Sequence, residues 1–578
     1  MAALIDALDN NTSIQFGEKG HVEYRWSNSV QEQILQFSFQ ITRTDDKTVE
    51  KLSFTLDKLL SILKNRLEKG TLPEKEVARG HLSILYRMIG HTRDIIDGKG
   101  EYTLSYMMVY TWNKFYPSLA QFALRCFVTL DNKNIHQFGS WKDLKYFCEY
   151  CKNNGENINH PLIQYSVMLI NEQIKVDYSN FISNSNEISL AAKWVPREKS
   201  SFGWIYQCLA VDFFHYYMET ANTEDRVQKA TLKCKTEYRK IISSLNRNID
   251  TLQIKQCGHY WKNIDFDKVT SISLLKQKKA FLNIKKNGEV RFPENKDRVI
   301  CAEKFKNHIQ RSLKGEVEMK GKRVGMADFV NQALLLIESE SQVEKDLLNS
   351  QWRDNGNQTL SLGKMIAMVD VSGSMNGEPM NVAIGLGIRI AEKSVIGNRV
   401  MTFSSKPTWV NLQGCTDFIS KVEMVRNAEW GTNTNFHAAL DMILDAIIQN
   451  RMTAEDVQDM VLVILSDMQM DAGDRCDKDV LYETMTTKYA SAGIRVNGVP
   501  YKPPHIIFWN LRHTSGFPSL ANQRNVSMMS GFSPSLLNLF CDQGITALQS
   551  CTPWAQLERS LENERYKIMS DKINEIII

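Results

Sequence analysis

The sequence is poor in the residues that keep a chain extended or cross-linked. Its 578 residues include only 30 glycines and 13 prolines, which argues against long disordered or collagen-like stretches. The 11 cysteines are an odd number without framework spacing, so we expect reduced thiols in a cytosol-like compartment. The tightest pair, Cys148 and Cys151, has no second pair at zinc-site spacing, and two buried free thiols are the favoured interpretation.

Long hydrophobic runs and an excess of one charge are also missing. No apolar run approaches the ~18–20 residues that a membrane helix needs. The N-terminus has no basic region before an apolar block, so we expect no secretory signal and a cytoplasmic location. Lysine and arginine exceed aspartate and glutamate by 70 to 66, a formal net charge of +4. Any surface that binds nucleic acid must therefore be local.

Helical periodicity dominates the first half of the chain. Apolar residues recur three and four apart in Lys51–Leu67 and again in Val77–Ile96, and short joints with glycine or proline separate successive segments. This pattern predicts an α-helical scaffold, built either as a solenoid or as an irregular bundle. No repeat of fixed period decides between the two.

The pattern changes after Gln351. Strand-length apolar runs at Lys364–Val371, Met460–Asp467 and His505–Leu511 alternate with helical segments, one of which we expect to end at Gly493. Strands that are almost wholly apolar indicate a parallel sheet covered on both faces. The predicted fold is thus multidomain, a helical region followed by a doubly wound, Rossmann-like α/β domain.

The predicted domains follow from these two patterns, since 578 residues exceed what one core holds. The tail after Trp554 is expected to form one more charged helix. The boundaries are an N-terminal extension at 1–48, a helical scaffold at 49–350, the α/β domain at 355–545 and a C-terminal helical tail at 546–578.

Oxygen-bearing side chains follow the first predicted strand of the α/β domain. A D-x-S-x-S loop places Asp370, Ser372 and Ser374 at its carboxyl end, where doubly wound sheets bind ligands. One carboxylate and two hydroxyls suit Mg²⁺ or Mn²⁺ better than zinc. A later strand ends in Asp467, and a threonine-containing segment precedes the middle helix.

This combination resembles the von Willebrand factor A (vWA) domain with its metal-ion-dependent adhesion site. The resemblance implies that Ser372 and Ser374 bind the ion directly. It also implies that Asp370 and Asp467 contribute through water or as hydrogen-bond acceptors.

The threonine of this site has two candidates. Thr434 has the family's usual spacing to the following helix and is preferred to Thr432. After the later strand the family often has Thr-Asp-Gly, whereas this chain has Ser466-Asp467-Met468 and so lacks the glycine of that turn.

Several longer motifs resemble an uncharacterised family of intracellular proteins from plants, fungi and giant DNA viruses. The motifs are Trp141–Phe147, Ala191–Glu198, Phe508–Arg512 and Met529–Phe540. That family combines a helical N-terminal region with a C-terminal vWA domain, and its activity is unknown. The domain order is also distantly similar to the Ro-type (TROVE) ribonucleoproteins, in which a ring of helical repeats closed by a vWA domain binds RNA.

A local basic segment bears on whether this chain binds RNA as the Ro-type proteins do. Residues 276–323 contain 15 Lys and Arg against 6 Asp and Glu. Lysine and arginine side chains hold phosphates, so the candidate RNA-binding residues are Lys285, Lys286, Lys322 and Arg323. The alternative interpretation is an ordinary solvated surface on helices and a linker.

The function expected from these observations is non-enzymatic binding inside the cell. A Mg²⁺ or Mn²⁺ ion at the adhesion site would capture an acidic group of a protein partner, without any membrane. RNA binding by the basic segment is the alternative. A metal-dependent hydrolase comes third, because no nucleophile and base are paired in the sequence. If the chain is viral, packaging in the virion is a further expectation.

Overall fold

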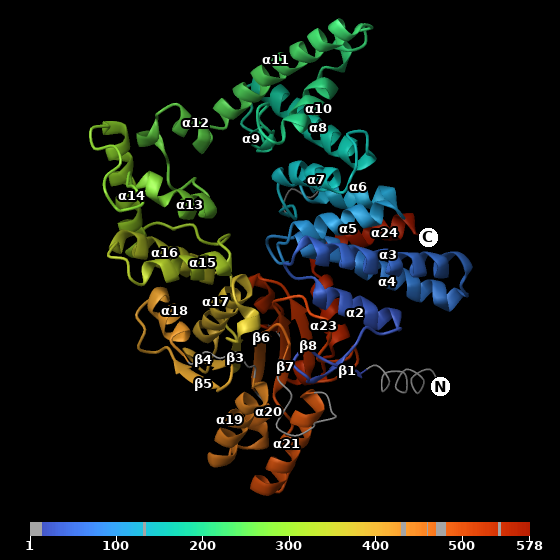
Figure 1. Ribbon diagram of the computed structural model, residues 1–578, viewed down its shortest axis with the longest axis vertical. Helices are drawn as coiled ribbons and strands as arrows, with labels where there is room; N and C mark the ends of the chain where they lie inside the picture. The colour runs from blue at the N-terminus through green and yellow to red at the C-terminus, as the bar shows by residue number, and fades with distance from the viewer. Residues whose placement is uncertain are drawn as a thin grey trace.

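The computed structural model shows an α/β protein that is mostly helical, with an N-terminal helical region and a C-terminal mixed sheet (Figure 1). It describes residues 14–130, 135–428, 435–458, 460–469, 481–541 and 545–577. Every helix in this described part is too short or too polar to cross a membrane.

The helical region runs in an arc whose two ends lie against the sheet domain (Figure 1). A short antiparallel hairpin of β1 (Ile14–Phe16) and β2 (Val22–Tyr24) precedes it. The helices are α2 (Val30–Gln40), α3 (Asp46–Lys69), α4 (Leu72–Arg93), α5 (Thr103–Asn113), α6 (Pro117–Cys126), α7 (Lys142–Asn153), α8 (Pro161–Ile182), α9 (Ala191–Trp194), α10 (Gly203–Phe213), α11 (Glu224–Asn248), α12 (Leu252–Cys257), α13 (Ser271–Phe281), α14 (Lys296–Leu313), α15 (Met326–Leu336) and α16 (Gln342–Gly356).

The sheet domain has six strands in the order β5-β4-β3-β6-β7-β8. The strands are β3 (Met365–Asp370), β4 (Arg399–Phe403), β5 (Thr408–Asn411), β6 (Val461–Ser466), β7 (His505–Asn510) and β8 (Val526–Ser530). The helices are α17 (Glu378–Lys393), α18 (Phe418–Arg426), α19 (Phe436–Gln449), α20 (Ala454–Gln458), α21 (Leu481–Asn497), α22 (Ile545–Ser550), α23 (Pro553–Leu561) and α24 (Lys567–Ile576).

The order of the strands reverses between β3 and β6. From β3 the chain builds β4 and β5 on one side, and it then returns to add β6, β7 and β8 on the other. Met365 pairs with Val461 across this point, in parallel register. The reversal is the topological switch point at which open α/β sheets bind ligands.

Both faces of the sheet are buried, as the apolar strands predict. Along β3, Ile366 and Met368 join a hydrophobic core that extends into the helical arc, whereas Ala367 and Val369 join a second core beneath α17. The alternation is the period-two geometry of a strand, in which successive side chains point to opposite faces.

Two details of the α/β domain differ from expectation. The sheet is mixed rather than wholly parallel, because the edge strand β5 runs antiparallel to β4. This strand has only four residues, directly after Pro407, and so short a segment shows too little alternation of apolar and polar residues to predict a strand. The segment from Trp554 onward lies in two helices, α23 and α24, separated by a short 3₁₀ turn, instead of in one.

Gly493 does not end a helix, because α21 continues to Asn497. A Cβ atom added at Gly493 would lie 2.1 Å from the backbone nitrogen of Tyr501. The glycine is therefore required for the close approach of the returning chain. The positive φ of +70° that accompanies the end of the helix occurs at Gly498.

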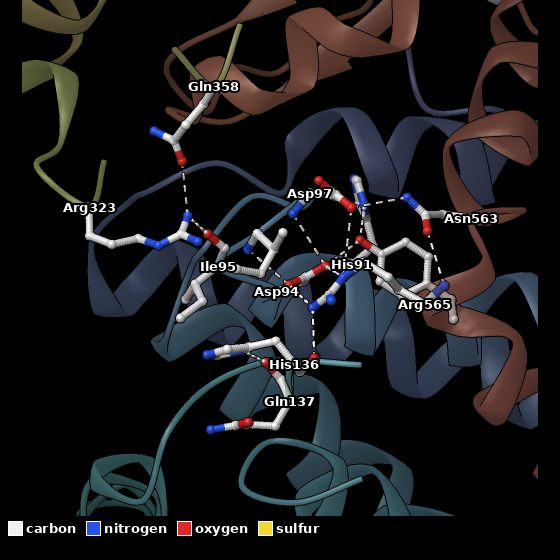
Figure 2. Close-up of polar contacts among 12 residues, drawn as sticks. His91, Asp94, Ile95, Asp97, His136, Gln137, Arg323, Gln358, Asn563 and Arg565 are labelled. Atoms are coloured by element: carbon white, nitrogen blue, oxygen red, sulfur yellow. Dashed lines mark hydrogen bonds and ion pairs between the residues drawn. The ribbon is translucent and has the colours of Figure 1, made fainter. Parts of the chain in front are cut away.

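The chain's N-terminal and C-terminal segments join the two regions. Backbone hydrogen bonds of 2.9 Å connect Tyr24 of β2 with Phe517 in the loop before β8. The C-terminal helix α24 packs on α4, where a Cβ atom at Gly90 would lie 2.7 Å from the sulfur of Met569. Figure 2 shows Arg565 of the tail beside Asp94, with hydrogen bonds of 2.7 and 2.6 Å.

Candidate metal centre

Asp370 ends β3 at the switch point and is fully buried. Its Oδ1 accepts a hydrogen bond of 2.9 Å from the backbone nitrogen of Ser372. Its Oδ2 accepts one of 2.6 Å from the hydroxyl of Ser466, at the end of β6. These two bonds fix the carboxylate between the neighbouring strands.

Burial and the neighbouring carboxylate of Asp467 raise the pKa of Asp370 to about 6. Both causes disfavour the ionised form, because an anion in a nonpolar environment loses its hydration and repels a second anion. A cation placed between these two groups would offset both effects.

The two serines of the loop lie together. The hydroxyl oxygens of Ser372 and Ser374 are 3.1 Å apart, with Ser372 buried and Ser374 half-buried. The structure therefore brings these two predicted donors to one side of the turn that begins after Asp370.

Asp467 completes the described part of the predicted set. Its Oδ1 accepts a hydrogen bond of 3.1 Å from the backbone nitrogen of Gln469, whereas its buried Oδ2 has no hydrogen-bond partner. Met468 adopts φ +63°, a left-handed conformation, at the position where the vWA site that this loop resembles often has glycine. A buried carboxylate oxygen without a donor is rare and costly, which suits an acceptor for a cation.

Thr432 and Thr434 both lie outside the described residues, so the choice between them stays a prediction. The next residue, Asn435, donates from its backbone nitrogen to the carbonyl oxygen of Ser404, just beyond β4, at 2.8 Å. Its side chain caps α19 by accepting from Ala438. The start of α19 is thus anchored at the carboxyl end of the strand beside β3.

The donor chemistry fits Mg²⁺ or Mn²⁺. Asp370, Ser372, Ser374 and Asp467 offer hard oxygens from two neighbouring strand ends. The described residues contain no cluster of three or more His, Cys, Asp or Glu side chains that could hold a metal ion. Hydroxyl groups would therefore have to supply much of the coordination.

Arg512 is a residue of this site that the sequence reasoning missed as a functional side chain. Its Nη1 donates to the carbonyl oxygen of Ser374 at 2.5 Å and lies 3.8 Å from Oδ2 of Asp467. The side chain is 53% exposed, so its positive charge reaches the surface of the site. The motif Phe508–Arg512 was visible in the sequence, but nothing in it indicated contact with a loop 138 residues earlier.

The four candidate RNA-binding residues lie at two separate places in the structure. Lys285 and Lys286 lie on an exposed turn between α13 and α14, where Lys285 pairs with Glu289 at 2.9 Å. Lys322 pairs with Glu318 at 3.1 Å.

The side chain of Arg323 makes hydrogen bonds that connect the two ends of the helical arc (Figure 2). Its Nη1 donates to the carbonyl oxygen of Ile95 at 2.5 Å and to Gln358 at 3.3 Å. Its replacement would therefore disturb the arc as well as any bound RNA.

The pair Cys148 and Cys151 lies buried on α7. Burial raises the pKa of Cys148 to about 12 and also raises that of Cys151, so both thiols stay protonated at neutral pH. Protonated, enclosed thiols are poor nucleophiles and poor metal ligands, which agrees with a packing role.

Comparison with known proteins gives matches of uncharacterised function. Residues 160–354 match a domain of unknown function, DUF2828, and residues 364–576 match another, DUF7788. The gap between the matches separates α16 from β3. The chain is also 28% identical over 541 residues to "Uncharacterized protein L728" of Acanthamoeba polyphaga mimivirus, covering 91% of this chain and 84% of that protein. The expected similarity to uncharacterised proteins that include a giant-virus member is confirmed.

Proposed function

We propose that this protein is a non-enzymatic binding protein whose sheet domain is a vWA domain with a working metal-ion-dependent adhesion site. The observation that carries the proposal is the meeting of Asp370, Ser372, Ser374 and Asp467 at the switch point, with one buried oxygen of Asp467 lacking a donor. The strand order, counted along the domain as 3-2-1-4-5-6, is the doubly wound order that binds ligands there.

The site's residues favour an anionic partner. Bound Mg²⁺ or Mn²⁺ would supply a positive centre that a carboxylate from another protein can reach. Ser372 and Ser374 are neutral donors and would leave much of the ion's charge uncompensated. Arg512 adds a second, exposed positive charge beside Asp467. An acidic side chain of a partner protein is the group that this arrangement would attract.

Direct metal binding is the first test. The free Mn²⁺ concentration would be followed by electron paramagnetic resonance as the full chain is titrated. We expect one bound ion per chain, lost in Ser374→Ala, whose half-buried side chain can be shortened without opening the core. Ser491→Ala is the matched control, because it removes a hydroxyl from an exposed position of the same domain. Unchanged binding by Ser374→Ala would refute the site.

Partner capture is the second test. The chain would be used as bait in native lysate with and without a chelator, and the eluted protein and RNA would both be identified. We expect a protein band that needs Mg²⁺ and is absent with Ser374→Ala bait. Capture that survives both the chelator and the substitution would rule out coordination as the mechanism.

RNA binding by the basic segment stays a prediction, and the structure sharpens its test. Lys285 and Lys286 are exposed on a turn, so Lys285→Glu with Lys286→Glu changes charge without touching a buried contact. Arg323→Glu is not suitable for this test, because it would also break the hydrogen bond to the carbonyl oxygen of Ile95 and disturb the arc. Binding through phosphates should weaken steeply with salt and be lost in the double variant. Unchanged affinity in that variant would remove these two residues as the RNA contact.

A further inference from the structure

A cavity of about 510 Å³ lies where the two ends of the helical arc meet the sheet domain. Lys142 reaches it from the N-terminal end of the arc, and Lys276 and Arg323 reach it from the other end. Ser533 and Ser535, which follow β8, complete its wall from the sheet domain. Because none of the metal-site residues lines it, this cavity is separate from the site already described.

The cavity is strongly basic. Its described lining contains seven Lys and Arg side chains against two carboxylates, Asp328 and Glu378. Some of the cations are neutralised: Arg93 pairs with Asp143 at 2.7 Å, and Arg43 pairs with Glu101 at 3.1 Å. Those ion pairs leave other cations for a ligand.

Four lining cations have no carboxylate ion pair in the described part of the chain: Lys99, Lys142, Lys276 and Arg323. Lys99 is buried and donates to two backbone carbonyls and to the hydroxyl of Ser530. Lys142 donates to the hydroxyl of Tyr102, and Arg323 donates to a backbone carbonyl and an amide. The side chain of Lys276 is exposed and makes no hydrogen bond or ion pair with another described residue. Positive charges from both ends of the arc thus face one space, where they outnumber the lining carboxylates Asp328 and Glu378.

The N-terminus of α15 adds donors to the same space. Gly325, Met326 and Ala327 line the cavity, and Gly325 at the N-cap has no side chain that could satisfy the first backbone N–H groups. An uncapped helix start beside lysine side chains favours phosphate, and Asp328 in the first turn of α15 contributes one opposing charge.

An aromatic cavity adjoins the basic one. It has a volume of about 560 Å³ and shares Tyr102 and Lys142 with the first. Its other walls include Tyr146, Tyr150 and Trp194. Side chains of this kind offer flat faces on which a heterocyclic base can stack.

We propose that the paired cavities bind a nucleotide, with its phosphates on Lys142, Lys276 and the start of α15 and its base against Tyr146 and Trp194. The basic and the aromatic cavity share one wall, formed by Tyr102 and Lys142, which places phosphate-binding and base-stacking groups side by side. Because the phosphates would touch both ends of the arc, the bound nucleotide also holds those ends together.

Binding of adenosine triphosphate to the full chain, measured by calorimetry, tests this inference. Tripolyphosphate serves as the ligand without a base, and EDTA keeps the metal site out of the measurement. We expect adenosine triphosphate to bind at least about tenfold more tightly than tripolyphosphate, since stacking adds to the phosphate contacts. Lys276→Glu should weaken both ligands about tenfold or more. Tyr146→Ala should weaken only adenosine triphosphate.

Two controls separate this site from others. Lys286→Glu makes the same charge reversal on an exposed turn outside both cavities and should leave binding unchanged. Ser374→Ala, which disables the proposed metal site, should also leave it unchanged. The inference is overturned if neither ligand binds, if both bind equally, or if only an RNA oligonucleotide binds. It is also overturned if Lys286→Glu weakens binding as much as Lys276→Glu does.

Discussion

Arg512 donates a hydrogen bond of 2.5 Å to the backbone carbonyl of Ser374, which connects the end of β7 to the D-x-S-x-S loop that follows β3. The same Nη1 lies 3.8 Å from Asp467, so one guanidinium touches two parts of the predicted site. In the proposed site, Arg512 would therefore compete with a bound ion for Asp467 and would also attract an acidic partner.

The competition predicts opposite effects of one substitution. Arg512→Met removes a positive charge next to Asp467, so Mn²⁺ affinity should rise about three- to tenfold, the size expected for charges near a protein surface. Capture of the acidic partner should weaken, because a cation at the rim is lost. Mn²⁺ titration and pull-down on the same preparation measure both effects. A fall in Mn²⁺ affinity would instead mean that Arg512 chiefly orders the loop of Ser374.

The buried ion pair between Arg93 and Asp143 predicts a large loss of stability. Both side chains are fully buried, with hydrogen bonds of 2.7 and 2.8 Å, and the hydroxyl of Tyr106 donates to Asp143 at 2.6 Å. Asp143→Ala would leave an uncompensated buried cation, which costs about 3–5 kcal/mol. Thermal unfolding followed by circular dichroism should show a melting point lower by several degrees.

An apolar double variant is the control for this pair. Arg93→Met with Asp143→Leu removes both charges together and should recover part of the lost stability. If the double variant is less stable than Asp143→Ala, the ion pair acts by organising the surrounding turn. The motif Trp141–Phe147, which includes Asp143, would in either case have a structural basis.

Glu32 predicts a dependence of stability on pH. It lies buried on α2 and accepts hydrogen bonds of 3.1 and 3.0 Å from the backbone nitrogen of Ala521. Burial raises its pKa from 4.5 to about 7, so between these values the folded chain binds the proton more tightly than the unfolded chain. Stability from this group is therefore highest below pH ~4.5 and falls by about 3 kcal/mol as pH rises to ~7.

Glu32→Gln isolates that effect, because it keeps an acceptor for Ala521 without the charge. The melting point of the variant should exceed that of the natural chain at pH 8 and nearly equal it at pH 5. A difference that is the same at both pH values would show that Glu32 does not titrate in this range.

Two helix glycines predict opposite responses to the same substitution. Gly493→Ala would place a Cβ atom 2.1 Å from the backbone of Tyr501, and overpacking of this kind costs about 1–3 kcal/mol. Gly80 lies on the exposed face of α4 with no atom within 4 Å of an added Cβ, so Gly80→Ala should stabilise the chain by up to about 1 kcal/mol. Melting points of the two variants test the pair. A stabilising Gly493→Ala would contradict the close approach.

Much of the fold follows from local pattern, as particular elements show. The apolar runs Lys364–Val371 and Met460–Asp467 predict β3 and β6, each within a residue or two. The strand β5 and the helix α18 escaped detection, because a short edge strand and a two-turn helix give little periodicity. Gly493 was misread since glycine is common both at helix ends and at close contacts, and only the position of Tyr501 distinguishes them.

Some residues of the candidate site can be identified from the sequence, whereas others are identified only by the folded structure. The D-x-S-x-S loop and Asp467 could be found from the sequence because each directly follows a recognisable strand. Arg512 could not be assigned a role, since its contact with Ser374 depends on how two separate loops meet. Lys142 and Lys276 likewise belong to different helices, and only the folded arc brings them to one cavity.

The sequence by itself determined the order of helices and strands, the burial of the sheet on both faces, and the oxygen donors at two strand ends. These features depend on residues close together in the chain, whose periodicity and turns are local properties. Tertiary structure alone decided that β3 and β6 are neighbours and that Arg512 reaches the D-x-S-x-S loop. It also decided that the arc's ends enclose a basic cavity. Such contacts join segments many residues apart, and their geometry depends on the packing of the whole chain.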